Sequence, residues 1–161
     1  MVVSDVEQIR RVAAEVVDPE IPVLTIDDLG ILREVRVDGA GHVDVDITPT
    51  YSGCPALDVI RADVARSVRD AGYPDVKVNV VLSPAWTTDW MSDIARRKLH
   101  DYGIAPPRER DAHMTLLKLA VECPLCGSAH TSEVSHFGST PCQALLRCAG
   151  CAEPFPHFKE H

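Results

Sequence analysis

Three features are missing from this sequence, and each absence argues against a class of function. No run of about 18 apolar residues occurs, so no membrane-spanning helix is expected. The opening MVVSDVEQIRR has neither the basic start nor the apolar stretch of a signal peptide, so we expect a cytoplasmic protein. The formal charge of −8 comes without a basic stripe, which argues against a nucleic-acid partner because such binding needs lysine and arginine on phosphates.

What is present fits a soluble globular chain. Its 161 residues are 45% hydrophobic and 25% charged, enough for one domain or for a domain with a small metal-stapled module. Residues 104–111 are rich in proline and charge, as linkers are. We therefore predict a first domain over residues 1–105, a linker over 106–113 and a ribbon-like domain over 114–161.

Hydrophobic periodicity predicts an α+β fold. Helical spacing indicates helices that begin near residue 5, near residue 55 and near Thr87, the last carrying Trp90 and Ile94. Alternation predicts strands over residues 31–37, 43–47 and 76–80. The expected fold is a small three-stranded sheet with packed helices, followed by a C-terminal zinc-ribbon-like module.

Two C-x2-C pairs are the most specific pattern in the chain. Cys123 and Cys126 form the first pair, and Cys148 and Cys151 form the second. A two-residue gap lets both thiolates of a pair face one ion, and two pairs complete the tetrahedron that Zn²⁺ favours. Iron fits a four-sulfur site as well, and two reducible thiol pairs without metal are the remaining alternative. A closed four-sulfur site would serve structure or partner binding rather than metal catalysis.

One further cysteine lies in the same segment. Cys142 is read as a buried thiol, as an alternative ligand or as a functional thiol. The histidines of this segment are expected at the surface, because four sulfurs already satisfy zinc: His130, His136, His157 and His161.

Cys54 stands apart from the other five cysteines. It is expected at a helix start, with Pro55 at the first helical position. The partial positive charge of a helix N-terminus would let this thiol lose its proton easily, so that it could bind a soft metal or transfer a thiol. The bland alternative is a small residue that happens to precede a helix. Asp18 and Glu20, in a proline-flanked loop, are read either as solvated acids or as groups that cap the backbone or lie near Cys54.

Several motifs together resemble known families. DPEIP at residues 18–22, DLG at 28–30, TPTYSGCP at 48–55 and PAWTT at 84–88 resemble the SufT-like family of iron–sulfur cluster assembly. FGST at residues 137–140, the cysteines that follow and EPF at 153–155 are similar to the PaaD family. PaaD proteins are accessory factors encoded with the multicomponent phenylacetyl-CoA epoxidase of bacterial aromatic degradation. The resemblance covers about residues 5–159.

The resemblance implies roles that spacing alone does not give. The family's functional thiol, which contacts a cluster or a client protein, falls on Cys54, and its supporting acidic loop falls on Asp18 and Glu20. Cys142 lies inside the PaaD-like segment and becomes a candidate extra thiol. Structural Zn²⁺ and a transient iron–sulfur cluster are the implied cofactors.

The resemblance also implies partners. These are the epoxidase components, above all the iron–sulfur reductase, and the iron–sulfur assembly machinery; a homodimer is compatible with the small apolar sheet. The expected role is maturation of the reductase, with a stable non-catalytic subunit or scaffold of the oxygenase as the alternative. An electron carrier with iron at the four cysteines is a third reading. A direct oxygenase is least expected, since its di-iron site needs Glu-x-x-His pairs on facing helices and no Glu-x-x-His is expected in this chain.

Overall fold

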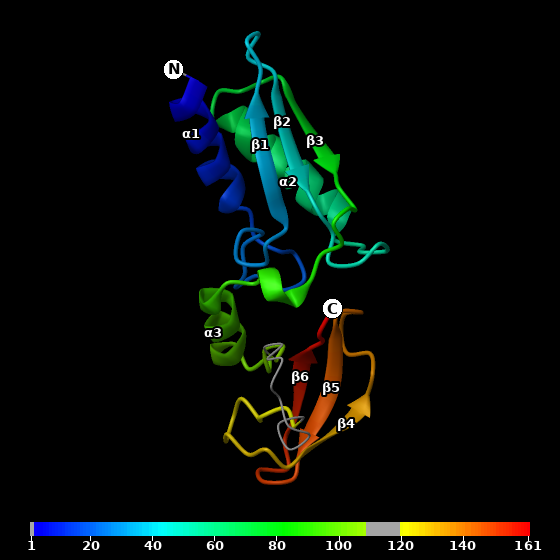
Figure 1. Ribbon diagram of the computed structural model, residues 1–161. Helices are drawn as coiled ribbons and strands as arrows, with labels where there is room; N and C mark the ends of the chain where they lie inside the picture. Colours follow the sequence, from blue (N-terminus) through cyan, green and yellow to red (C-terminus); the bar gives the residue numbers. More distant parts are fainter. Residues whose placement is uncertain (1, 109–119) are drawn as a thin grey trace. The chain divides into compact units, whose positions relative to one another are not determined.

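The computed structural model describes residues 2–108 and 120–161, and its contacts divide the chain into two compact units (Figure 1). Unit 1 comprises Met1–Trp86 and unit 2 comprises Thr87–His161. Each unit is described by itself. Within the described residues, no helix has the length and apolarity needed to cross a bilayer.

Unit 1 contains two amphipathic helices. Helix α1 spans Val2–Ala14 and buries Ile9 and Ala13. Helix α2 spans Leu57–Asp70 and buries three residues at helical spacing, Ile60, Val64 and Val68. Helix α2 ends before Gly72, whose φ of 101° is a conformation that residues with a Cβ rarely adopt.

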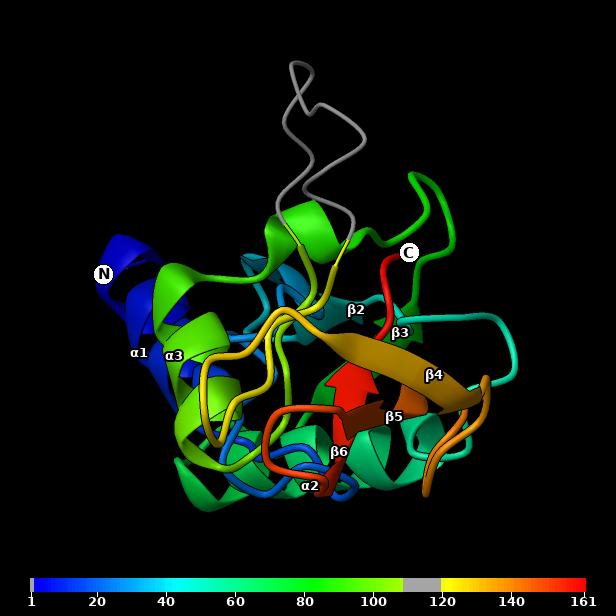
Figure 2. The ribbon, with the colours of Figure 1, turned by 90° about the horizontal axis from the view of Figure 1, so that it is seen from below.

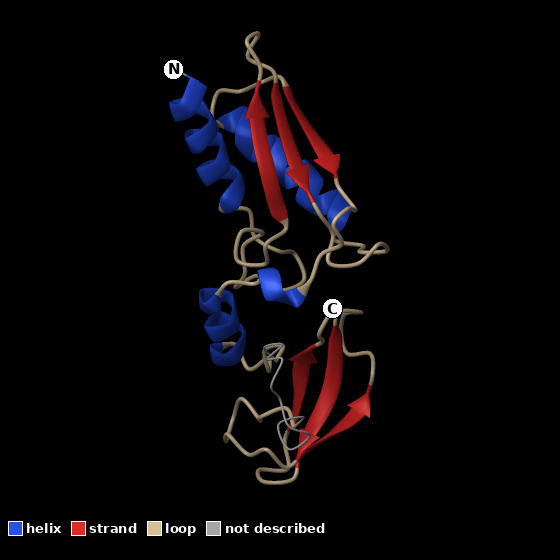
Figure 3. Ribbon diagram, in the orientation of Figure 1, coloured by secondary structure: helices blue, strands red, loops and turns tan. Residues whose placement is uncertain are grey.

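The sheet of unit 1 has the order β1-β2-β3. Strands β1 (Leu32–Val37) and β2 (Val43–Ile47) pair antiparallel, and β2 pairs parallel with β3 (Val76–Val80) through the α2 crossover. Both helices pack on one face of this sheet (Figure 3). The alternation of β2 explains this arrangement, because Val43, Val45 and Ile47 are fully buried against the helices while the aspartates between them face the other side.

The face away from the helices is charged. Arg36 donates to both carboxylate oxygens of Asp46, at 2.6 and 2.9 Å, and the Asn79 amide donates to Asp44 and Asp46 at 2.9 and 3.0 Å. The three strands are therefore joined by side-chain as well as backbone bonds.

Unit 2 begins with a short 3₁₀ helix, η1 (Thr88–Trp90), and helix α3 (Asp93–Asp101). The single helix predicted from Thr87 is wrong. The Thr87 hydroxyl caps only η1, the backbone is extended at Met91 (ψ 136°), and the Ser92 hydroxyl then caps α3 by accepting from the Ala95 N–H at 3.0 Å. Two capping residues five apart thus start two helices.

A second sheet, which is antiparallel throughout, completes unit 2. Strands β4 (Thr131–Ser135), β5 (Gln143–Cys148) and β6 (Pro154–Phe158) lie side by side in that order (Figure 2). The sequence predicted the ribbon module and the α+β class, and both are confirmed.

The core of unit 2 includes a residue from far upstream. Ala105 is 1% exposed, forms a parallel bridge to His157, and exchanges backbone bonds with Pro156 and Phe158 at 2.8 and 2.9 Å. Ile104, read from sequence as part of a linker, is also buried. The division at 105, 106–113 and 114 stays a prediction, and residues 109–119 of it lie outside the described residues.

Candidate functional sites

The four paired cysteines converge in unit 2. The Sγ atoms of Cys123 and Cys151 are 3.8 Å apart, those of Cys126 and Cys148 are 3.5 Å apart, and all four lie within 4.8 Å of one another. A tetrahedral zinc ion with bonds of about 2.3 Å would hold its sulfurs about 3.8 Å apart. The sulfur positions therefore fit a single ion of that size.

Local backbone geometry explains how each pair is positioned. In the first turn, Gly127 adopts a φ of 74° and donates to the Cys123 carbonyl at 2.8 Å. In the second, the Gly150 N–H donates to the Cys148 sulfur at 3.2 Å. A Cβ on Gly150 would lie 3.0 Å from the Ser128 Cβ, so glycine is what lets the two turns approach.

The four sulfurs do not share one electrostatic state. Although the Ser128 N–H lowers it, the bond to Cys148 and burial raise the pKa of the Cys126 thiol to about 12, and the pKa of Cys151 is raised as well. The backbone N–H of Cys151, together with a thiol bond from Cys126 and the N–H of Gly150, lowers the pKa of the Cys148 thiol to about 6, although burial opposes the shift. Deprotonated sulfur is the form that binds metal, so Cys148 is the ligand already inclined to thiolate, and a cation at the centre would favour thiolate at the other sulfurs.

The remaining thiol of this segment lies outside the cluster. Cys142 is 5% exposed, and its sulfur lies 3.1 Å from the Thr140 hydroxyl. It therefore packs as a buried thiol, one of the three readings that the sequence left open.

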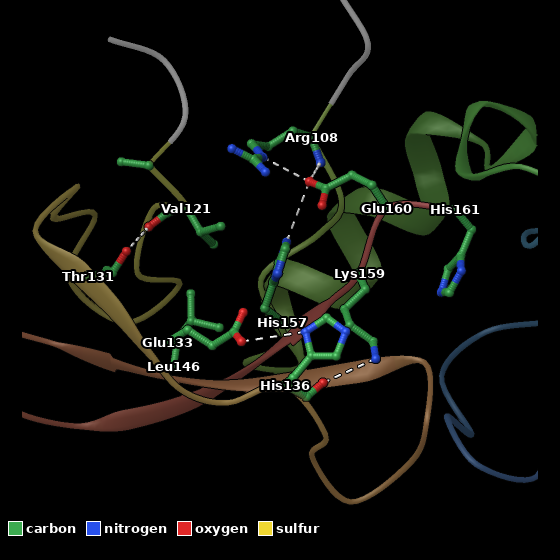
Figure 4. A pocket seen from close by; sticks show the side chains of 11 residues that line it. Arg108, Val121, Thr131, Glu133, His136, Leu146, His157, Lys159, Glu160 and His161 are labelled. Atoms are coloured by element: carbon green, nitrogen blue, oxygen red, sulfur yellow. Dashed lines mark hydrogen bonds and ion pairs between the residues drawn. The ribbon is translucent and has the colours of Figure 1, made fainter. Parts of the chain in front are cut away.

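One histidine contradicts the expectation of surface positions. His157 is 5% exposed, and its Nε2 atom has no hydrogen-bond partner within the described residues. Burial, partly offset by Glu160, lowers the pKa of its ring. His157 lines a cavity of about 500 Å³ in unit 2 together with charged and apolar side chains (Figure 4). Periodicity does not reveal this burial, because His157 packs beside Ala105, which comes from far upstream.

The wall of this cavity is held by ion pairs. Glu160 accepts from the backbone N–H and the Nε of Arg108, at 3.0 and 2.8 Å. Although burial opposes it, the Arg108 bonds lower the pKa of Glu160 to about 2. The expectation that no Glu-x-x-His occurs is wrong, because Glu133 and His136, 3.4 Å apart, form one. Glu133 lies on strand β4 rather than on a helix, however. The arrangement therefore lacks the facing helices of a di-iron site.

Cys54 lies in a turn of unit 1 rather than at a helix start. Helix α2 begins at Leu57, so Pro55 is not its first residue. The Cys54 N–H donates to the Tyr51 carbonyl and its carbonyl accepts from Leu57, both at 3.2 Å. The sulfur is half-buried and receives bonds from the backbone of Ala56 and the side chain of Thr50.

The expected easy deprotonation of Cys54 is wrong. Burial is the largest effect on this thiol and raises its pKa, and the negative charges of Glu20 and Asp18 raise it further. The bonds from Ala56 and Thr50 lower it only in part. The N–H of Ala56, the residue that precedes helix α2, bonds the sulfur, but this contribution does not outweigh burial.

Asp18 is a capping group rather than a solvated acid. It is 7% exposed, and its Oδ1 accepts from the backbone N–H of Glu20 and of Ile21, both at 2.8 Å. Burial raises its pKa, and the two backbone bonds act against that. Since both acids act on the Cys54 thiol, the acidic loop and the thiol loop are neighbours, as one sequence reading proposed.

Two residues with structural contacts in unit 1 were not singled out from the sequence. Thr50 bonds the Cys54 thiol, and Trp86 is buried with its Nε1 donating to the Leu29 carbonyl at 2.8 Å. Trp86 thereby ties the segment after β3 to the DLG turn. Both residues lie in motifs recognised above, which was the available signal, but periodicity assigns them no role.

Comparison with known proteins matches both units. A family model described as an iron-sulfur cluster assembly protein matches residues 6–80, and a PaaD zinc beta ribbon domain matches residues 108–159. Among solved structures, a DUF59 domain of unknown function from Bacillus anthracis is 28% identical with a TM-score of 0.56, covering 60% of this chain and 92% of that one. A conserved hypothetical protein from Thermotoga maritima is 28% identical with a TM-score of 0.50, covering 58% and 91%.

Curated relatives add the full-length match. A protein of Escherichia coli (strain K12), which bears the name of one subunit of a "Putative 1,2-phenylacetyl-CoA epoxidase", is 47% identical over 154 residues, which cover 96% of this chain and 92% of the relative. An "Fe-S protein maturation auxiliary factor" of Porphyromonas gingivalis is 40% identical over 94 residues, covering 58% and 89%.

Fold, cysteine cluster and matched families define a two-module protein, an iron–sulfur cluster assembly domain followed by a zinc β ribbon domain. The long relative joins both modules in the same order over nearly its whole length. The chain belongs to the PaaD family.

Proposed function

We propose that this chain is an accessory protein that assists iron–sulfur cluster assembly for a phenylacetyl-CoA epoxidase system. The names of its relatives support both parts, since the short relatives are Fe-S maturation factors and the long one carries the epoxidase name. The observation that carries the proposal is a half-buried thiol, Cys54, held beside the acidic pair Asp18 and Glu20.

The surroundings of Cys54 suit a thiol that stays protonated until a metal binds it. Its raised pKa keeps it protonated near neutral pH and so protects it from alkylation and oxidation, which need thiolate. Iron bound as cargo displaces the proton, because metals bind the deprotonated sulfur. The carboxylates of Asp18 and Glu20 then favour the approach of a cation through the same charge that disfavours a bare thiolate.

In this proposal the ribbon holds zinc as a structural ion. Cys123, Cys126, Cys148 and Cys151 would supply four thiolates, leaving no open position for a substrate. Bound zinc would supply folding free energy to a module whose own core is small. The ribbon would then present a stable surface to the client.

The proposed client is the iron–sulfur reductase of the epoxidase. We suggest replacing Cys54 with Ser in cells that make the whole system, and measuring the iron and sulfide content of the purified reductase. A fall of at least about fivefold is expected, while Cys142→Ser, a matched loss of one thiol, leaves the content unchanged. Full cluster content in the C54S cells would remove the assigned role of this thiol.

The word "subunit" in the name of the long relative favours a second candidate, a stable non-catalytic subunit of the oxygenase. Purification of the epoxidase from the same cells separates the two. Fixed stoichiometry through size exclusion favours the subunit, whereas dissociation with a matured reductase favours the maturation factor.

A further inference from the structure

The outer edge of β3 offers an unpaired row of backbone groups. In unit 1, β3 pairs with β2 on one side, and no other described strand pairs with it. The Val81 N–H donates to the Ile47 carbonyl at 2.8 Å, so Val81 and every second residue before it point their backbone groups toward β2. Because the direction alternates along a strand, Val76, Val78 and Val80 point their N–H and C=O groups outward. Such an edge is a template for another strand.

A shallow groove of about 370 Å³ accompanies this edge between β3 and α2. Ala62, Ala65 and Val78 line its middle, and their small size lets a neighbouring surface approach closely. Helix α2 runs opposite to β3, so Asp58 lies toward the end of the strand and Arg69 toward its start (Figure 1). The groove therefore carries Arg69 at one end and the exposed pair Asp58 and Arg61 at the other.

We propose that β3 pairs antiparallel with β3 of a second copy of this chain, about a twofold axis at Val78. This register sets Val78 opposite itself and Val76 opposite Val80. All three have outward backbone groups, so each opposed pair exchanges two N–H···O bonds, about six in all. The two sheets become one continuous sheet, and both exposed edges are covered.

The same axis matches the charges of the groove. It brings Arg69 of each copy toward Asp58 of the other, because the two residues lie at opposite ends of one groove. Asp58 also has Arg61 at 3.6 Å in its own helix, and both side chains are exposed, so Asp58 can accept a second cation. The contact across the axis is thus between Arg69 of one copy and Asp58, with its neighbour Arg61, of the other.

The far face of the sheet is compatible with this pairing. Exposed Lys77 comes opposite Asn79 of the other copy, whose amide binds Asp44 and Asp46. A cation is thus placed next to an acidic cluster on each side of the axis, which adds attraction rather than repulsion.

The backbone part is tested by the mass of the full-length, zinc-loaded protein from about 1 to 200 µM, by sedimentation or light scattering. A dimer is expected for the natural chain. Val80→Pro removes an outward N–H without breaking a bond to β2, and should weaken the dimer at least about tenfold. Val80→Thr keeps that N–H and should leave the dimer unchanged.

The charge part is tested by a swap. Arg69→Glu and Asp58→Arg each create a like-charge contact and should weaken the dimer at least about threefold, whereas the double variant D58R/R69E should recover affinity. Arg66→Glu, on the same helix but outside the groove lining, controls for the change of net charge and should have no effect.

Three results would overturn the inference. The first is a natural chain that stays monomeric at about 200 µM. The second is a dimer that V80P does not weaken, and the third is a pair of charge variants whose combination fails to restore affinity. Thermal unfolding of each variant distinguishes loss of the dimer from loss of the fold.

Discussion

Cys54 is held in a state that its sequence neighbours did not suggest. A thiol with a raised pKa reacts slowly by itself, and the acids that raise the pKa also attract cations. The Cys54 thiol is therefore held in its protonated form rather than activated as a thiolate. This combination suits a thiol that must bind iron before it reacts with an oxidant.

Glu20→Gln should lower the pKa of Cys54, because the negative charge of Glu20 raises it. Alkylation of Cys54 at about pH 8 should become faster by about twofold or more, with the rate profile shifted toward lower pH. Site-resolved mass spectrometry measures this rate separately from the other cysteines. Glu15→Gln, at an exposed turn directly after α1, should leave the profile where it is, and an equal shift in that control would contradict the local effect.

Asp18→Ala should destabilise unit 1 by about 1–3 kcal/mol, because the backbone N–H groups of Glu20 and Ile21 lose their acceptor. Asp18→Asn keeps an acceptor oxygen and should cost clearly less. Urea denaturation followed by the fluorescence of the buried Trp86 measures both. Equal stability of the D18A variant and the natural chain would show that water replaces the carboxylate.

At this scale the sequence singled out candidate residues, and one of its readings placed the acids near Cys54, but it did not indicate how deeply they are buried. Cys54, Asp18 and Glu20 were found through motifs and loop position. The burial of Asp18 and the raised pKa of Cys54 depend on contacts between segments more than thirty residues apart, which periodicity cannot reveal.

Among the elements, the two cysteine turns are what holds unit 2 together. Cys148 lies at the end of β5 and belongs to the buried core with Ala105 and Phe155, so the metal site and the apolar core are continuous. Loss of the ion should therefore disturb more than the turns themselves.

Cys148→Ser should lower zinc affinity at least about tenfold and unfold residues 120–161, because metal and fold are coupled. Metal analysis gives the zinc content, and the chemical-shift dispersion in the NMR spectrum reports separately whether each unit is folded. Cys142→Ser removes a buried thiol outside the cluster and should keep a full complement of zinc. A zinc-free C148S protein with a native ribbon spectrum would refute the structural role.

Gly72→Ala should cost about 1 kcal/mol, since Gly72 adopts a φ of 101° after helix α2. A Cβ there meets nothing within 4 Å, so the cost reports backbone strain alone. Gly39→Ala, where the Cβ also meets nothing and the φ is ordinary, should change stability by less than about 0.5 kcal/mol. Chemical denaturation of both variants gives the comparison.

Sequence periodicity predicted the strands better than the helix boundaries. Strands β2 and β3 match their predicted ranges, because alternation with glycine or proline at the ends is a local signal. The structure has η1 and α3 in place of the third predicted helix, since Thr87 and Ser92 each cap a helix and the buried Met91 between them is extended.

For the whole molecule, charge is the quantity that sequence alone predicts well. A chain with a net charge of −8 repels phosphate backbones at long range. Mobility-shift assays with duplex DNA and with RNA at about 150 mM salt should therefore detect no complex up to about 10 µM protein. A shift that disappears with rising salt would reveal a basic surface that composition conceals.

The bridge between Ala105 and β6 bears on how this protein can be dissected. A truncation that starts at Met114 would discard Ile104 and Ala105, and with them the backbone partners of Pro156 and Phe158. The excised piece would keep every zinc ligand yet lose a wall of its interior. A self-sufficient fragment must therefore start upstream of residue 104, well before its first cysteine.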